Sequence, residues 1–169
     1  TVNTTATSNF TLDNGTQAVI VAGGTVNGAV SVTTSGAISQ TGALAVTGTS
    51  SFTSTGTNTN IDLNNTGNNF GGAISFSTLG TTGNVTVDNG TTAINLGTLT
   101  VNGALSVTSG GGITDTGITT VTGTSAFITN VNNVDILLDS ANVIQGAITF
   151  TTQGTTSDVT LNNGSTAIS

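Results

Sequence analysis

The sequence predicts an all-β protein in which short parallel strands stack into a solenoid, and three observations carry this prediction. Apolar and polar residues alternate in short runs such as Val30–Val32 and Val85–Val87, the pattern of half-buried strands. Glycine-containing corners separate these runs, and no stretch shows helical periodicity. The phrase TVNGAVSV at Thr25–Val32 also returns as TVNGALSV at Thr100–Val107, the mark of a repeat array.

The repeat divides the chain into units of about 75 residues. Between Asn14–Phe52 and Asn89–Phe127, 22 of 39 positions are identical. Placing unit boundaries at matching Asn-Gly pairs gives a partial unit 1–13, a unit 14–88, a unit 89–162 and a partial unit 163–169. We expect them to form one continuous solenoid segment, 1–169.

Each unit contains four phrases, taken here in chain order. Alternating residues flank Asn27-Gly28 in the first phrase, and Leu44–Val46 and Phe52 flank Thr47-Gly48 in the second. The third joins Ile61–Leu63 to Ile74–Phe76 through a longer bend at Asn64–Gly72. The fourth runs from Val85–Val87 through Asn89-Gly90 to Ile94. Apolar anchors of successive phrases are about 19 residues apart on average, which we take as one coil.

Tandem antiparallel β-sandwich modules of about 75 residues are the alternative architecture. The subdivision of each unit favours the solenoid, because strands of a sandwich occupy different positions and need not resemble one another. The absence of proline and of any linker between units favours the solenoid as well.

The phrases predict turn residues and core residues. Asn-Gly is a strong turn signal, and we expect the glycines after Asn27, Asn89 and Asn102 to have positive φ. The predicted turn residues are Asn14, Gly15, Asn27, Gly28, Asn89, Gly90, Asn102, Gly103, Asn163 and Gly164. The predicted core residues are Val26, Val30, Val32, Val46, Phe52, Ile61, Leu63, Ile74, Phe76, Val85, Val87, Val101, Leu105, Val107, Phe127 and Phe150.

The composition excludes several classes of partner. The chain has no Lys, Arg or His, and its seven acidic residues give a net charge of −7. Nucleic-acid binding depends on cationic side chains, so we expect none. No apolar run approaches the length of a membrane span, so we expect no membrane insertion. Without cysteine, the sequence gives no redox indication of compartment.

The aspartates are the only candidate acids or metal ligands, and comparison between units argues that they are turn residues. Asp13 and Asp88 correspond to Asn162, and Asp135 corresponds to Asn60. The other aspartates are also replaced: Asp115 by Gln40, Asp139 by Asn64, Asp158 by Asn84 and Asp62 by Leu137. A turn tolerates the exchange of Asp for Asn, whereas a metal ligand or a catalytic acid does not. We therefore predict no metal site, no cofactor and no enzymatic activity.

Three further patterns bear on binding. The six Phe residues close alternating runs and are expected in the core rather than on a sugar-binding surface. Thr-x-Thr pairs that could form an ice-binding face, such as those around Gly48 and Gly123, do not keep one register. Seven Asn-x-Ser/Thr sequons occur at Asn3, Asn9, Asn14, Asn64, Asn84, Asn89 and Asn163, as many as composition alone would give. Those at the Asn-Gly corners are expected to be exposed.

The runs TVNGALSVTSGGGITDTG at 100–117 and VTGTSAF at 121–127 resemble the repeat regions of filamentous-haemagglutinin-like proteins. These include two-partner-secretion adhesins and very long bacterial surface proteins. The resemblance implies a right-handed parallel β-helix, export across the outer membrane and a role as an adhesive or structural fibre. The secretion domain of that family is not evident in this chain.

These observations predict a structural segment of a long fibre or adhesin shaft, located outside the cell or on its surface. The alternative is a solenoid module that binds a glycan or ice. Expected partners are the chain itself, by end-to-end stacking, by continuation of a longer chain or by lateral bundling, and a host or matrix glycan or protein.

Overall fold

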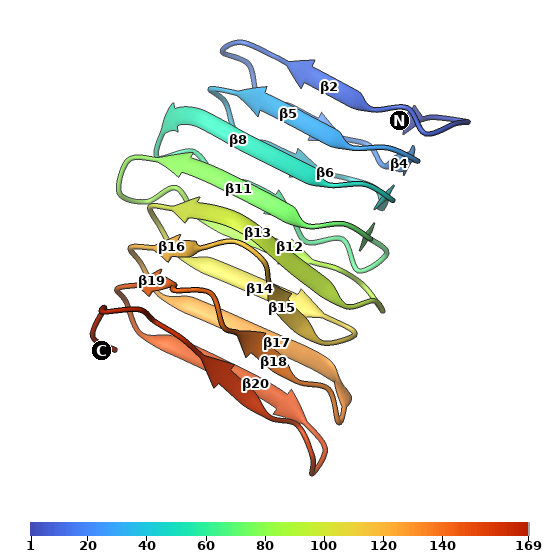
Figure 1. Cartoon of the computed structure of the whole chain (residues 1–169). Helices are drawn as coiled ribbons and strands as arrows, with labels where there is room; N and C mark the ends of the chain where they lie inside the picture. The colour runs from blue at the N-terminus through green and yellow to red at the C-terminus, as the bar shows by residue number, and fades with distance from the viewer. Residues whose placement is uncertain (169) are drawn as a thin grey trace.

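The computed structural model describes residues 1–168, and in this range every paired strand pairs in parallel. The strands stack from the N-terminal coil to the C-terminal coil as successive rungs of one rod (Figure 1). The rod has about 8 turns of roughly 20 residues each. The predicted all-β solenoid is therefore confirmed, and the antiparallel sandwich is wrong.

Three sheets line the rod. The four-stranded sheet contains β1 (Val2–Asn3), β4 (Gly24–Val26), β7 (Leu44–Val46) and β10 (Asn69–Phe70). The seven-stranded sheet contains β3 (Val19–Val21), β6 (Ile38–Gln40), β9 (Ile61–Leu63), β12 (Val85–Asp88), β14 (Leu105–Ser109), β17 (Ser125–Asn132) and β20 (Ile148–Gln153). The ten-stranded sheet contains β2 (Phe10–Asp13), β5 (Val30–Thr34), β8 (Ser50–Thr57), β11 (Ile74–Leu79), β13 (Ile94–Val101), β15 (Ile113–Asp115), β16 (Thr119–Val121), β18 (Ile136–Leu138), β19 (Val143–Ile144) and β21 (Val159–Leu161).

The ten-stranded sheet covers two sides of the rod because β13 spans a corner. The first half of β13, from Ile94 to Leu96, pairs with β15, whereas its second half, from Leu99 to Val101, pairs with β16. On the other side of β13, Phe76 and Ser77 of β11 pair with Leu99 and Thr100 of the second half. The line of strands β2, β5, β8 and β11 thus continues through the second half of β13 to β16 and β19.

We name the three sides by these lines of strands. Face A contains β1, β4, β7, β10, the first half of β13, β15, β18 and β21. Face B contains β2, β5, β8, β11, the second half of β13, β16 and β19. Face C is the seven-stranded sheet. Each coil visits faces A, B and C in this order.

The repeat unit and the coil do not coincide. The phrase of β5 on face B returns as β14 on face C, and β8 and β11 likewise return as β17 and β20. Conversely, β9 and β12 on face C return as β18 and β21 on face A. One sequence unit therefore occupies three complete coils and one face of a fourth coil. As a result, each unit is rotated about the rod axis by one face relative to the preceding unit.

The lengths of individual coils vary. Val19 pairs with Ile38 of the next coil, whereas Ile61 pairs with Val85, so the second of these coils contains more residues. The segment Asn64–Gly72, predicted as a bend, contains the short strand β10, and its additional residues lie in the connection between β9 and β10. The predicted average of about 19 residues per coil is therefore slightly shorter than the observed value of roughly 20 residues.

Alternate side chains point into the rod and form one apolar core. All the predicted core residues are buried except Phe150, which is partly buried and packs against the core. Phe52 stacks on Phe76 of the next coil with ring centroids 6.0 Å apart, and Phe127 stacks on Phe150 at 5.7 Å. The first pair lies on face B and the second on face C, in keeping with the shift of one face per unit.

Candidate functional site

The corners at Asn14, Asn89 and Asn163 share one geometry. The following glycines, Gly15, Gly90 and Gly164, have φ of +57°, +61° and +54°. Side chains other than glycine rarely adopt this conformation, which explains why the pair is Asn-Gly. The residue before each Asn caps the turn, because Asp13, Asp88 and Asn162 each accept a hydrogen bond from the backbone nitrogen of the corner glycine.

The corners at Asn27 and Asn102 differ, and the prediction of positive φ for their glycines is wrong. Gly28 and Gly103 are required by the close approach of successive coils instead. A Cβ on Gly103 would lie 2.8 Å from the carbonyl carbon of Gly83, and one on Gly123 would lie 2.6 Å from the carbonyl oxygen of Gly103. Gly83, Gly103, Gly123 and Gly146 stack on one another along the corner between faces B and C, whereas Gly28, Gly48 and Gly72 stack along the corner between faces A and B.

The side chain of a corner Asn points inward at two of the three corners, so the prediction that these sequons are exposed is wrong. Asn89 is fully buried and Asn163 is nearly so. Asn14 is half-buried. In all three residues Nδ2 donates two hydrogen bonds to nearby oxygen atoms. A glycan attached to this nitrogen would remove one of the two hydrogen bonds. Glycosylation of these three sequons would therefore conflict with the fold.

The exchange of Asp for Asn between units has a direct structural basis. Oδ1 of Asn60 accepts a hydrogen bond from the backbone nitrogen of Asn84 at 3.0 Å. Oδ1 of Asp135 accepts the equivalent bond from Asp158 at 2.9 Å. A carboxylate and a carboxamide oxygen serve equally as acceptors here, as expected for turn residues.

Asp115 is the one buried aspartate among the described residues. Its Oδ1 accepts hydrogen bonds from the backbone nitrogens of Asp139 and Ser140, and its Oδ2 accepts one from Asn142 at 2.8 Å. Gln40 has the same position one unit earlier and bonds Asn68 in both directions. Asp115 is thus a satisfied structural acceptor, and no group of three or more metal-ligating acids occurs within residues 1–168.

The sequence interpretation missed two structural pairs. Asn58 and Asn133 have φ of 61° and 60°, and each accepts hydrogen bonds from two backbone nitrogens of the next coil. Asn68 and Asn142 are fully or almost fully buried and join three coils. The two members of each pair lie one sequence unit apart, and neither is followed by glycine. Recurrence of Asn alone was the signal that could have identified them.

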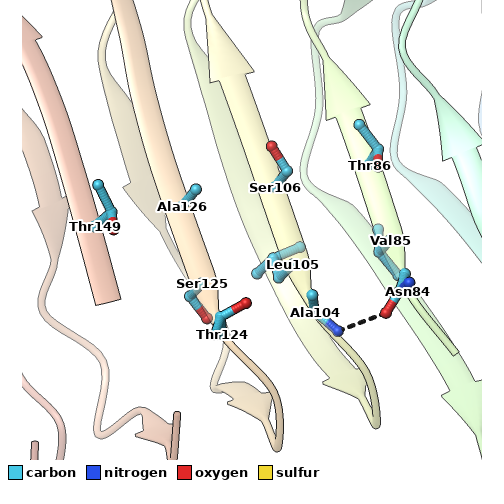
Figure 2. Close-up of a pocket in the computed structure, with 10 residues that line it drawn as sticks. All are labelled: Asn84, Val85, Thr86, Ala104, Leu105, Ser106, Thr124, Ser125, Ala126 and Thr149. Carbon is cyan, nitrogen blue, oxygen red and sulfur yellow. Dashed lines mark hydrogen bonds between the residues drawn. The ribbon is translucent and has the colours of Figure 1, made fainter. Parts of the chain in front are cut away.

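A shallow groove of about 290 Å³ lies on face C (Figure 2). Small outward side chains form it, with Thr86, Ser106, Ala126 and Thr149 on four successive strands. Asn84 lies at one end, where its Oδ1 accepts a hydrogen bond from the backbone nitrogen of Ala104 at 2.8 Å. The groove has no charged or aromatic lining residue, so its lining offers no acid or base that could activate its hydroxyl groups.

The fold and these repeated corners define a parallel β-solenoid repeat protein. A family model described as repeats of unknown function (DUF5649) matches residues 7–77 and 82–151, and the chain belongs to this family. The two matched copies begin one sequence unit apart, in agreement with the period of the sequence. Neither the curated proteins nor the solved structures contain a match. No helix long and apolar enough to cross a membrane occurs in residues 1–168.

Proposed function

We propose that the chain is a structural segment of an extracellular bacterial fibre or adhesin shaft, as its resemblance to filamentous-haemagglutinin-like repeats suggests. One observation carries the proposal: side-chain contacts repeat along the rod together with the sequence. Asn9 binds the backbone of Ala29 as Asn84 binds that of Ala104, and Asn89 binds Phe70 as Asn163 binds Ile144. These residues thus maintain the rod itself.

The energetics of such a rod suit a spacer. Each coil buries its apolar residues against the coils before and after it, so stability is a sum of similar nearest-neighbour terms. Length can then increase by whole units without a new kind of contact. In this proposal the shaft holds other parts of the parent protein away from the cell, or holds cells together in a matrix.

The proposed partners follow from the role as a shaft. The first partner is the chain itself, as a continuation of the rod, as a second copy at its end or as a second copy packed alongside it. The second partner is a host or matrix glycan or protein. The proposal assigns the protein no enzymatic activity, cofactor, nucleic acid or membrane insertion, and a net charge of −7 without any cation agrees with the exclusion of polyanions.

Deleting one unit tests the rod. Removing residues 14–88 takes out three coils and one face, so the particle should shorten by ~16 Å at ~4.8 Å per coil. Removing residues 30–49, one coil between the paired residues Val30 and Ser50, should shorten it by only ~5 Å. Small-angle scattering and negative-stain imaging measure both lengths. Compact particles of unchanged length would contradict the shaft.

The location needs a separate test on cells of the source organism. Antibodies raised against the purified segment should label intact cells, or material outside them, without permeabilisation. Labelling that appears only after permeabilisation would overturn the extracellular role even if the rod shape holds.

A further inference from the structure

The outward side of face B carries two rows of hydroxyl groups parallel to the rod axis. Their members are ladder partners on successive strands, and they alternate with inward residues such as Val32 and Phe52. The first row contains Thr11, Ser31, Ser51 and Ser75. The second contains Thr33, Thr53, Ser77, Thr100 and Thr120. These rows consist of other residues than the Thr-x-Thr pairs considered in the sequence, and strand pairing holds them in register.

These hydroxyl groups have no partner within residues 1–168, since none makes a side-chain hydrogen bond. The inward hydroxyls at the ends of the same strands differ: Thr34 binds backbone carbonyls of the preceding coil, and Ser54 binds the carbonyl of Gly36. A hydroxyl that is not needed by the fold keeps one donor and two acceptor positions for an external ligand.

The face is also free of charge beyond its first strand. Asp13, on β2, is the only aspartate among its strands. Asp62 and Asp88 lie on face C, and Asp115 ends β15 on face A. Asp135, Asp139 and Asp158 flank strands of face A. The outward residues of β5, β8 and β11 therefore form a regular and uncharged hydroxyl array.

We propose that this array on face B is an ice-binding surface. The hydroxyls repeat every ~4.8 Å along the rod and every ~6.6 Å along a strand, as fixed by strand spacing and rise. These distances are of the same order as those at which oxygen atoms repeat in the faces of ice. Because backbone ladders hold both rows, the hydroxyls can hydrogen-bond many lattice waters at once with little loss of backbone freedom.

The dimensions of the array favour a lattice over other ligands. Its second row covers five strands and is ~19 Å long, and both rows are present on β5, β8 and β11, over a patch ~10 Å long and ~7 Å wide. A stable protein partner needs ~800 Å² on each side, several times this area. A sugar-binding face would need an aromatic platform, but all six Phe residues pack in or against the core. A crystal surface needs neither a large complementary area nor aromatic rings.

The repeat supplies a matched pair of variants for the test. Thr33 and Thr108 occupy the same place in the phrases Val30–Thr33 and Leu105–Thr108, and both side chains point outward. Thr33 belongs to the array on face B. Thr108 lies on face C between Asp88 and Ile128, where the hydroxyl row is interrupted. Thr33→Tyr and Thr108→Tyr place the same bulky residue, which strands tolerate well, on the two faces.

The purified segment 1–169 should inhibit ice recrystallisation, and a fluorescently labelled sample should be incorporated into a growing ice crystal. Thr33→Tyr should raise the concentration needed for half inhibition by about tenfold, and Thr108→Tyr should leave it nearly unchanged. Circular dichroism and the melting temperature check that both variants are folded.

Three outcomes would overturn the proposal. The first is a folded wild-type segment that neither inhibits recrystallisation nor enters ice. The second is an equal effect of the two substitutions. The third is a change in sedimentation with Thr33→Tyr and no change in ice activity, which would assign the array to a lateral contact between copies of the chain.

Discussion

The side-chain oxygen of Asn89 accepts a hydrogen bond from the backbone nitrogen of Phe70, 2.6 Å away in the preceding coil. The amide nitrogen of the same side chain donates to the carbonyl of Ala93 and to the hydroxyl of Thr92. One fully buried carboxamide thus closes its own corner and joins it to the coil before it.

We predict that Asn89→Ala destabilises the segment by about 2 kcal/mol, because the buried nitrogen of Phe70 and the carbonyl of Ala93 lose their partner. Asn64→Ala is the control, since Asn64 is exposed, and it should change stability by no more than ~0.5 kcal/mol. Urea unfolding measures both. Equal stability of the two variants would show that the corner does not depend on this side chain.

Gly103 tests the stacking of glycines at the corner between faces B and C. Gly103→Val should cost at least about 2 kcal/mol, since its Cβ would overlap the backbone of Gly83 and force the coils apart. Thr100→Val exchanges one β-branched residue for another at an exposed strand position and should be nearly neutral. Thermal melts of the two variants give the comparison, and equal tolerance would argue against close contact between the coils.

Asp115 offers a test of the equivalence between units. Asp115→Gln restores the residue found at position 40 and should be tolerated within ~1 kcal/mol, because an acceptor for Asn142 remains. Asp115→Leu should cost about 3 kcal/mol or more, because it leaves two backbone nitrogens and Asn142 without their acceptor. Chemical denaturation of both variants measures the difference. Greater damage from Gln than from Leu would show that the two positions are not equivalent.

The purified segment should associate more strongly as salt is added. Its negative charges repel between copies, and at ~0.15 M salt this repulsion is screened beyond ~8 Å. Strand edges that remain unpaired in the isolated segment can then pair with those of another copy. Sedimentation velocity between low and high salt checks this. Thr160→Lys on the last strand, β21, should reduce the association, and a species that stays monomeric at all salt concentrations would contradict the prediction.

Much of the fold could be predicted because its signals are local. Alternation places Val32 or Phe52 inward without any knowledge of the neighbouring coil, and the recurrence of TVNG shows that the pattern is an array. The positive φ of Gly90 is likewise predicted from the Asn-Gly pair, although the same pair at Gly28 and Gly103 does not have it. These features depend on residues close together in the chain.

The remaining features depend on contacts between coils, which the sequence does not display. Gly28 and Gly103 resemble turn glycines in sequence, but their role is set by the backbone of the preceding coil. The burial of Asn89 similarly depends on Phe70 in the preceding coil. The two hydroxyl rows of face B appear only when Thr33 and Thr53 are aligned by strand pairing.

Each sequence unit is rotated about the rod axis by one face relative to the preceding unit, and a longer rod built from such units would repeat this rotation. Successive copies of one epitope would wind around the axis with three-fold screw symmetry, advancing ~16 Å per copy, so each of the three faces would carry a copy at every third unit. Each position would also experience three lateral environments in turn, and selection would favour residues that are acceptable in all of them. The uniform composition of the chain, rich in Thr, Ser, Asn, Val and Gly, agrees with this requirement.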